Sequence, residues 1–333
     1  MDHVRKTLAL IENAANLRRE LIDQTDAYRV FNGFYEGYPG LVLDRYGPCL
    51  VIFDHGLPEG SDPLLQEITA WALSPAQGVG SVLLKQRQNT DPLKKNGVLL
   101  AGTSLPGVIR ESGVNYALDL RMAQDAGFYL DTRGLRSWLR EHAAGSRVLN
   151  TFAYTGSLGV AVGAGGAEEV VQTDLSNKFL EISLLSWKLN ELDSEKTRIQ
   201  PGDFFKVTDR MRRQGRLFDI VILDPPFFST TDAGRVDLEG ETARLINKVR
   251  PLVAHGGKLV VINNALFLPG AGFISELEEL CKSEYLSFSE IIPVPPDITG
   301  YPGTIIDAPP VDPAPFNHPT KIAILDVVRK DEK

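Results

Sequence analysis

The stretch that decides the fold is Arg147-Val-Leu-Asn-Thr-Phe-Ala-Tyr-Thr-Gly-Ser157. It begins with a short apolar strand and passes into a loop that ends at Gly156, after which a helix begins. A glycine lets the backbone approach a ligand closely, and the first N–H groups of a helix have no partner inside the helix. The stretch therefore predicts a strand, loop and helix that bind a ligand at the loop.

A second stretch, Phe218-Asp-Ile-Val-Ile-Leu-Asp-Pro-Pro-Phe-Phe228, belongs to the same predicted site. Its apolar run at 220–223 is long enough for a strand that is buried on both faces, and two consecutive prolines end it. In open α/β sheets, ligands bind at the carboxyl ends of the strands. We interpret the first stretch as a cofactor loop and the second as a catalytic loop.

From residue 147 onward, predicted strands alternate with predicted helices. The expected strands are 148–151, 169–173, 197–200, 220–223, 258–263, 286–292 and 320–328, and the expected helices include 132–142, 177–191, 235–253 and 273–282. This alternation predicts an α/β fold with a Rossmann-like, doubly wound, mostly parallel sheet of seven strands. Asp174, Asp203 and Asp224 follow three of the strands and would converge on the Gly156 loop, although each alone also suits a helix cap.

The N-terminal third predicts a smaller α+β domain, which we place at residues 1–107. Its expected elements are an amphipathic helix at 2–24, strands at 28–31, 41–46, 49–53 and 81–85, and a helix at 62–73. Its most basic cluster is either a solvated face or a phosphate contact that would make the domain face RNA; the cluster consists of Lys85, Arg87, Lys94 and Lys95. The catalytic domain would span 108–333 and begin with a lead-in hairpin.

Composition narrows the class of protein. With 333 residues, 43% of them hydrophobic, the chain can build two cores, and its net charge of −8 argues against nucleic-acid binding through bulk electrostatics. Cys49, Cys281 and five scattered histidines have no metal-ligand or disulfide spacing, so we expect no metal. No apolar run approaches the ~20 residues of a membrane span, and the first residues lack a signal-peptide core. We expect a cytoplasmic protein with no membrane partner.

The turn after the first strand does not fit a dinucleotide cofactor. Such a site needs Gly-x-Gly-x-x-Gly directly after the strand, whereas here the first glycine is missing and aromatic residues stand in its place. Asp174, eighteen positions after Gly156, suits a ribose diol in either class of cofactor. Asp224-Pro225-Pro226-Phe227 is more discriminating, because a carboxylate or carbonyl fixed by prolines can accept a hydrogen bond from a planar nitrogen nucleophile while the ring stacks on its face.

With these motifs the chain resembles class I S-adenosylmethionine-dependent methyltransferases, and within them the group that methylates large-subunit ribosomal RNA. The matching segments are 25–29, 37–46, 124–133, 150–156, 172–174 and 223–228. Close relatives often carry a separate N-terminal RNA-binding domain before the first of these segments. Here only the predicted helix at 2–24 stands there, so we expect the chain to lack that domain.

The resemblance implies S-adenosylmethionine as cofactor and assigns roles to residues of this chain. The methionine part would contact Asp131, Arg133, Asn150, Phe152, Tyr154, Thr155 and Gly156. The ribose would bind Asp174, and the adenine would lie against Asp203 and Phe204. The methyl acceptor would be positioned by Asp224, Pro225, Pro226 and Phe227, with Asp224 also lining the cofactor site.

The predicted function is S-adenosylmethionine-dependent N-methylation of a base in ribosomal RNA. Carbon 5 of a pyrimidine ordinarily needs a cysteine thiolate to add to the ring first, and the catalytic loop has no cysteine. The alternatives are a methyltransferase acting on a small molecule or a protein, and a non-catalytic cofactor-binding RNA module. The sequence fits a monomer and a homodimer equally.

A proline-rich segment at 293–319 joins the last two predicted strands. It is either an inert surface loop or a stiffened loop that contacts substrate. In the second case the contacts would come from Tyr301, Phe316, Asn317 and His318.

Overall fold

The computed structural model describes residues 2–238 and 240–329. It divides into two compact units: unit 1 is the chain up to Leu130 together with Pro295–Pro309, and unit 2 is Asp131–Val294 with the chain from Pro310 onward. The predicted boundary lay between residues 107 and 108, so the hairpin that we assigned to the catalytic domain falls in unit 1.

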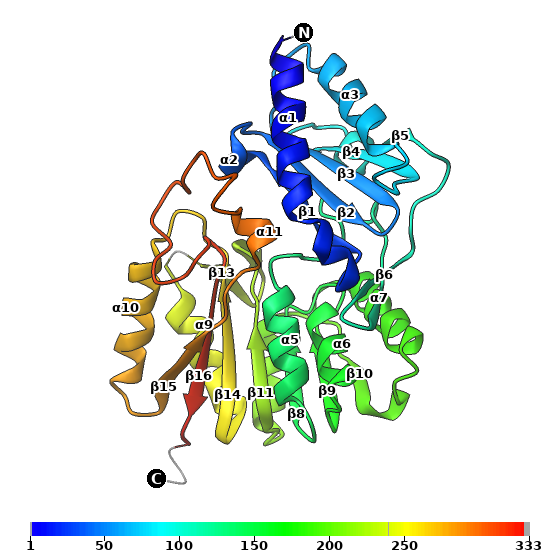
Figure 1. Cartoon of the computed structure of the whole chain (residues 1–333). Coiled ribbons are helices and arrows are strands. Elements are labelled where there is room, and N and C mark those ends of the chain that lie inside the picture. The colour runs from blue at the N-terminus through cyan, green and yellow to red at the C-terminus, as the bar shows by residue number, and fades with distance from the viewer. Residues whose placement is uncertain (1, 239, 330–333) are drawn as a thin grey trace. The chain divides into compact units, whose positions relative to one another are not determined.

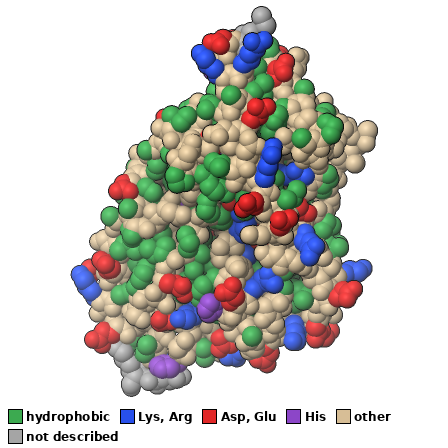
Figure 2. All heavy atoms as spheres, viewed as in Figure 1, with side chains coloured by type: hydrophobic (Ala, Val, Ile, Leu, Met, Phe, Trp, Pro, Cys, Tyr) green, Lys and Arg blue, Asp and Glu red, His purple; other side chains and the backbone are tan. Residues whose placement is uncertain are grey.

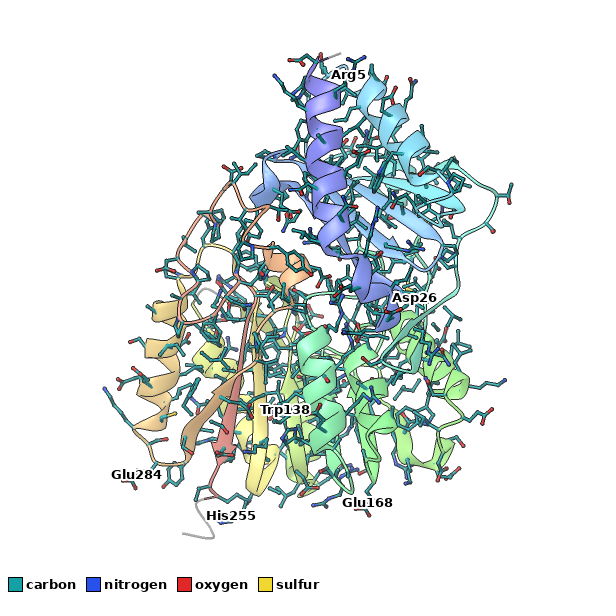
Figure 3. The ribbon with its side chains drawn as sticks, viewed as in Figure 1. Arg5, Asp26, Trp138, Glu168, His255 and Glu284 are labelled. Atoms are coloured by element: carbon teal, nitrogen blue, oxygen red, sulfur yellow. The ribbon has the colours of Figure 1, made fainter. Side chains whose placement is uncertain are left out.

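Backbone contacts explain why the hairpin of β6 (Val108–Glu111) and β7 (Val114–Ala117) packs with unit 1. The Arg110 N–H donates to the Asp26 carboxylate over 2.7 Å, and the Asp26 N–H donates to the Arg110 carbonyl over 3.0 Å (Asp26 is labelled in Figure 3). The hairpin is therefore fastened to the start of the N-terminal sheet.

Unit 1 contains a five-stranded sheet in the order β1-β2-β3-β4-β5, in which only β3 and β4 are parallel. The strands are β1 (Ala27–Asn32), β2 (Leu41–Tyr46), β3 (Cys49–Asp54), β4 (Ser81–Gln86) and β5 (Val98–Ala101). Helices α1 (Asp2–Leu17) and α3 (Asp62–Ala72) pack their apolar sides against it (Figure 1). The shorter elements are η1 (Arg19–Asp23), α2 (Gly33–Glu36), α4 (Pro92–Asn96) and α11 (Pro296–Thr299).

The first helix ends earlier than predicted, at Leu17, because the next side chain turns inward. Arg18 is completely buried and forms a 3.0 Å ion pair with Glu36 of α2. It also donates to the Asp297 carbonyl of α11 over 3.0 Å. This buried pair joins three segments of unit 1 that are distant in sequence.

The predicted basic cluster of unit 1 is corrected at Lys85. Its side chain is buried, and its ammonium donates to the carbonyls of Asn96, Ala123 and Asp125 over 2.7, 2.8 and 3.1 Å. Burial lowers the pKa of Lys85 to about 8. Lys85 therefore holds the backbone of this unit together and does not present charge to RNA.

Unit 2 contains a seven-stranded sheet in the order β10-β9-β8-β11-β14-β16-β15. All neighbouring strands are parallel except that β16 is antiparallel to both of its neighbours. The strands are β8 (Arg147–Thr151), β9 (Glu169–Thr173), β10 (Thr197–Ile199), β11 (Phe218–Leu223), β14 (Val253–Asn263), β15 (Leu286–Ile291) and β16 (Lys321–Val327). The predicted doubly wound, mostly parallel sheet is confirmed.

The apolar runs of these strands bury side chains on both faces of the sheet, as alternation along a strand requires. One face, with Val148 and Ile222, packs against α5 (Arg133–His142), α6 (Ser157–Ala164) and α7 (Asn177–Leu189). The other face, with Leu149 and Val221, packs against α8 (Phe204–Arg213), α9 (Thr242–Val249) and α10 (Gly270–Cys281). On α5, Trp138 (labelled in Figure 3) donates to Glu290 of β15 over 2.8 Å.

A helix over 235–253 was predicted, and that prediction is wrong in its first part. Residues Phe228–Thr231 and Gly234–Asp237 form a hairpin of two strands, β12 and β13, and α9 begins only at Thr242. Val236 is buried between the outward-facing Arg235 and Asp237, which is the period of a strand. Two one-turn elements, η2 (Ser194–Lys196) and η3 (Arg250–Leu252), complete unit 2. None of the described helices is long and apolar enough to cross a bilayer.

Candidate active site

The predicted site lies at the carboxyl edge of the unit 2 sheet, where the strand order reverses. β8 and β11 are neighbours, with Thr151 opposite Leu223. From β8 the chain continues to β9 on one side, whereas from β11 it continues to β14 on the other. The two loops therefore start at the same edge of the sheet and run in opposite directions. In open α/β sheets, the crevice between two such loops is where ligands bind.

The loop after β8 adopts an unusual backbone conformation. Phe152 and Tyr154 have positive φ angles of 54° and 51°, which non-glycine residues rarely adopt. Contacts with β9 hold the loop in place: the Ala153 N–H donates to the Thr173 carbonyl and the Tyr154 N–H to the Asp174 carboxylate, both over 2.9 Å. Strained backbone that its surroundings fix in this way is common where ligands bind.

Gly156 is required at the end of this loop by its neighbours as well as by its own φ of 76°. A Cβ there would lie 2.2 Å from the Ser183 hydroxyl of α7 and 2.6 Å from the Gln172 side chain of β9. The predicted close approach is therefore to the protein's own α7 and β9.

Asn150 lies behind the loop in a buried polar network. It donates weakly to Gln172, over 3.4 Å, and Gln172 donates to Ser183 over 2.6 Å. Among the described residues, the buried Asn150 Oδ1 accepts no hydrogen bond. Asn150 is thus a predicted site residue that is buried beneath the loop. Its Oδ1 atom is a hydrogen-bond acceptor that the network leaves unsatisfied.

Asp174 is half-buried at the carboxyl end of β9. One carboxylate oxygen accepts the Tyr154 N–H and the other accepts the Ser176 N–H, each over 2.9 Å. A carboxylate oxygen has more than one acceptor direction, so both can still accept hydroxyl donors. The position suits the recognition of a ribose diol beside the loop.

Asp203 and Phe204 are engaged in local packing. Asp203 caps α8 by accepting the Lys206 N–H over 3.1 Å and also accepts the Thr231 hydroxyl. Phe204 is buried and stacks on Phe152 at a ring-centroid distance of 4.5 Å. The helix-cap alternative holds for Asp203, while a role for either residue in binding adenine stays a prediction.

Two acidic side chains at the carboxyl edge of the sheet, Asp131 and Asp224, are close enough to interact electrostatically. Asp131, just before α5, accepts the Thr320 hydroxyl over 2.9 Å. The pKa of Asp224 is raised to about 7, first by burial and second by the nearby Asp131 carboxylate. A positively charged ligand group beside this pair would relieve both effects. The half-buried Arg133, at the start of α5, supplies a cation on the same edge.

The catalytic loop presents aromatic surface to solvent. Pro225 is buried, while Phe227 and Phe228 are 47% and 55% exposed. The Phe227 carbonyl accepts the Leu238 N–H over 3.1 Å, which fixes the loop to the far end of the hairpin. A rigid acidic group followed by exposed aromatic rings suits a planar substrate group, which can stack on a ring and donate a hydrogen bond to the carboxylate.

Lys321, which was not among the predicted site residues, holds the neighbouring loop after β14. Lys321 is buried opposite Asn263 and donates to the carbonyls of Ala265 and Pro319 over 2.9 and 2.5 Å. Burial lowers the pKa of Lys321 to about 8. The loop that it supports exposes Phe267. The only local signal in the sequence for this structural role of Lys321 was its position as the first residue of an otherwise mostly apolar strand.

Two predicted substrate contacts in the proline-rich segment are corrected. Phe316 is buried against Phe273, with ring centroids 5.6 Å apart. The Asn317 carboxamide accepts the Val294 N–H over 2.9 Å and donates to its carbonyl over 2.8 Å. Both side chains therefore stabilise unit 2. Tyr301 belongs to unit 1, where it lies under the Arg18 guanidinium.

Neither cysteine lies in the two loops. Cys49 is in β3 of unit 1, and Cys281 ends α10, which runs back from the carboxyl edge of the unit 2 sheet. Burial raises the pKa of both thiols. Within 2–238 and 240–329, no three histidine, cysteine, aspartate or glutamate side chains gather as a metal site would require.

Comparisons with known proteins agree on one family. A family model described as S-adenosylmethionine-dependent methyltransferase matches residues 56–307, which is more than half of the chain. YwbD of Bacillus subtilis, provisionally named a ribosomal RNA large subunit methyltransferase, is 30% identical over 78% of this chain and 66% of its own. Ribosomal RNA large subunit methyltransferase I of Aeromonas hydrophila is 36% identical over 62% of this chain and 53% of its own. The chain thus spans less than two thirds of these relatives.

Solved structures show the same fold. A provisionally assigned methyltransferase crystallised with SAH aligns with a TM-score of 0.84 over 97% of this chain and 82% of that chain, at 23% identity. A methyltransferase of Agrobacterium tumefaciens aligns with a TM-score of 0.63 over 92% of this chain and 91% of that chain, at 18% identity.

Proposed function

Because this chain belongs to the family of S-adenosylmethionine-dependent methyltransferases, we propose that it transfers a methyl group to a base nitrogen in ribosomal RNA. The observation that carries the proposal is the position of Asp224 at the carboxyl end of β11, directly before two prolines and an exposed phenylalanine. These residues would supply a proton acceptor, a rigid turn and a stacking ring at the carboxyl edge of the sheet.

The residues of the crevice fit S-adenosylmethionine. This cofactor carries two positive groups, an ammonium and a sulfonium, which complement the Asp131 and Asp224 carboxylates. Its own carboxylate would pair with Arg133, and its ribose hydroxyls would donate to Asp174. The loop from Phe152 through Tyr154 and Thr155 to Gly156 would hold the methionine part. Asp203 and Phe204 would border the adenine.

The protein's contribution to the reaction is positioning and proton acceptance. When bound, S-adenosylmethionine supplies an electrophilic methyl group. Asp224 and the carbonyls fixed by Pro225 and Pro226 would accept hydrogen bonds from the nitrogen nucleophile, and Phe227 would stack on the base. Kept ionised by the positive groups of the cofactor, the Asp224 carboxylate could take the proton that the nitrogen releases. Orientation of this kind can supply on the order of 7–11 kcal/mol.

Nitrogen is favoured over carbon because a carbon-5 acceptor ordinarily needs a thiolate. The two cysteines lie in β3 and at the end of α10, and burial raises the pKa of each thiol, which disfavours the nucleophilic form. A purine base suits the exposed ring of Phe227, since stacking on an aromatic side chain contributes ~1–3 kcal/mol.

Ribosomal RNA is favoured as the substrate because curated relatives carry the name of large-subunit ribosomal RNA methyltransferases. A reaction on ribosomal RNA would take place in the cytoplasm, as the sequence predicts. On the face shown in Figure 2, acidic and basic side chains are interspersed, which agrees with recognition by stacking and shape more than by bulk charge. A small molecule or a protein is the alternative acceptor.

A transfer assay with tritiated S-adenosylmethionine tests the proposal. The wild-type chain and Asp224→Asn are each incubated with ribosomal subunits from cells that lack this protein, and with total small-molecule extract. We expect label in large-subunit RNA with the wild type and roughly 100-fold less with the variant. Label confined to the small-molecule fraction or to protein would overturn the RNA substrate.

A further inference from the structure

The hairpin β12–β13 follows directly on the catalytic loop and has two chemically different faces. Its register pairs Phe228 with Asp237 and Thr230 with Arg235, so these four side chains lie on one face. The other face carries the buried Val236 and packs on the core of unit 2. The hairpin thus presents its Phe228 face to solvent.

The inward side of the hairpin is firmly anchored. The Thr231 hydroxyl donates to Asp203, the cap of α8. Gly234 approaches Phe205 so closely that a Cβ there would lie 2.4 Å from the ring. The Leu238 N–H donates to the Phe227 carbonyl, which ties the hairpin to the catalytic loop. Its outward side chains are therefore held at a fixed place beside Asp224.

The outward face carries Phe228 and Arg235, which together we call the platform. Phe228 is 55% exposed, and the Arg235 guanidinium lies over its ring, 5.2 Å from the centroid. Arg235 also forms an ion pair with Asp237, which orients the guanidinium and offsets its charge. A guanidinium stacked on a ring offers π surface to a nucleobase, and the ion pair with Asp237 leaves no net charge for a phosphate.

We propose that Phe228 and Arg235 stack an unpaired nucleotide next to the base that is methylated. The inference rests on the proposed function and extends it to the substrate's neighbouring residue. The platform lies next to the acceptor site along the chain, because Phe228 directly follows Phe227. A base held there fixes the register of the RNA strand, so the target base reaches Asp224 without a sequence-specific contact.

The proposal distinguishes stacking from phosphate binding. Because Asp237 offsets the charge of Arg235, loss of the platform should weaken RNA binding without changing its salt dependence. If Arg235 instead contacted a phosphate, Arg235→Ala would lower the slope of log Kd against log salt by about one.

The test compares Phe228→Ala, Phe228→Trp and Arg235→Ala with a matched control, Phe288→Ala. Phe288 is a 39% exposed phenylalanine on β15, away from the carboxyl edge of β11. Affinity for a labelled single-stranded fragment of ribosomal RNA containing the methylated position is measured by fluorescence anisotropy at several salt concentrations. KM and kcat are measured on the same RNA, and S-adenosylmethionine affinity by calorimetry.

We expect Phe228→Ala to raise Kd and KM for RNA about tenfold with an unchanged salt slope, kcat and cofactor affinity. Phe228→Trp should restore binding, Arg235→Ala should give a smaller loss, and Phe288→Ala should match the wild type. Unchanged Kd and KM in Phe228→Ala, or equal losses in Phe228→Trp, would overturn the platform while the proposed function stands. A wild-type chain that neither binds nor methylates RNA would overturn both.

Discussion

At the scale of single residues, the proposed chemistry depends on Asp224, whose ionised form is destabilised in the folded chain. Its pKa of about 7 in the folded chain lies above the ordinary value of 3.8 that it has when unfolded. Between these values the unfolded chain has released a proton that the folded chain retains. The free energy of unfolding contributed by this group therefore falls as pH rises through this window, and the loss is complete above pH 7.

Asp224→Asn should consequently stabilise the protein at pH 8 and have little effect near pH 4. Thermal melting of the wild type and the variant at the two pH values, without cofactor, measures the difference. The same variant should lose turnover roughly 100-fold, because its amide accepts no proton. Equal stabilisation at both pH values would contradict the assigned pKa.

Asp174 tests the cofactor side of the crevice. Asp174→Ala removes the acceptor of any ribose hydroxyl and should weaken S-adenosylmethionine binding by ~1.5–3 kcal/mol, the range of hydrogen bonds to a charged group. Asp193→Ala is the control, since Asp193 also accepts a backbone N–H, from Glu195 over 3.0 Å, but follows the far end of α7. Calorimetric affinities that are equal in the two variants would rule out the ribose contact.

At the scale of elements, local patterns in the sequence predicted the strands of unit 2 and the two loops at their ends. Apolar runs of fixed length and paired prolines are local signals, and they placed β8, β11 and the Asp224 turn correctly. Strand β13 was predicted as the start of a helix over 235–253, because contacts such as that of Gly234 with Phe205 are set by the fold and leave no local signal in the sequence. The roles of Lys321 and Thr320 were not predicted for the same reason, since the fold decides which residues they contact.

Gly156 is where an element-level requirement can be tested. Gly156→Ala should lower the melting temperature and weaken cofactor binding, because the new methyl group would lie 2.2 Å from the Ser183 hydroxyl in a left-handed conformation. Gly215→Ala is the matched control, with a φ of 66° and open space around it. The added loss in Gly156→Ala should be partly recovered in combination with Ser183→Ala. If the melting temperature of Gly156→Ala were no lower than that of Gly215→Ala, α7 would have to shift and make room for the new methyl group.

At the scale of the whole molecule, the chain folds as two units, and unit 1 is closed by a segment from near the C-terminus. Arg18 and Glu36 are both buried, and Glu36 also accepts the Thr304 hydroxyl over 2.6 Å. The predicted boundary at 107/108 did not include this segment. Contacts between residues 268 and 279 positions apart leave no signal in the composition of the chain.

Arg18→Ala should destabilise unit 1 by ~3–5 kcal/mol, because it leaves the Glu36 carboxylate buried without its partner. Hydrogen exchange of the β1–β3 amides reports on this unit separately from unit 2. Lys6→Ala, which removes the exposed pair of Lys6 with Asp2, is the control and should leave exchange unchanged. Exchange in Arg18→Ala that matches the control would show that the buried pair is dispensable.

The most direct test of the central claim is the identity of the methylated nucleoside. Large-subunit ribosomal RNA, methylated by the purified chain with deuterium-labelled S-adenosylmethionine, is digested and analysed by mass spectrometry beside Asp224→Asn and the double variant Cys49→Ala, Cys281→Ala. We predict a labelled base methylated on nitrogen, retained in the cysteine variant and nearly absent from Asp224→Asn. A pyrimidine methylated at carbon 5, or a product lost with the cysteines in a chain that still folds, would contradict the account.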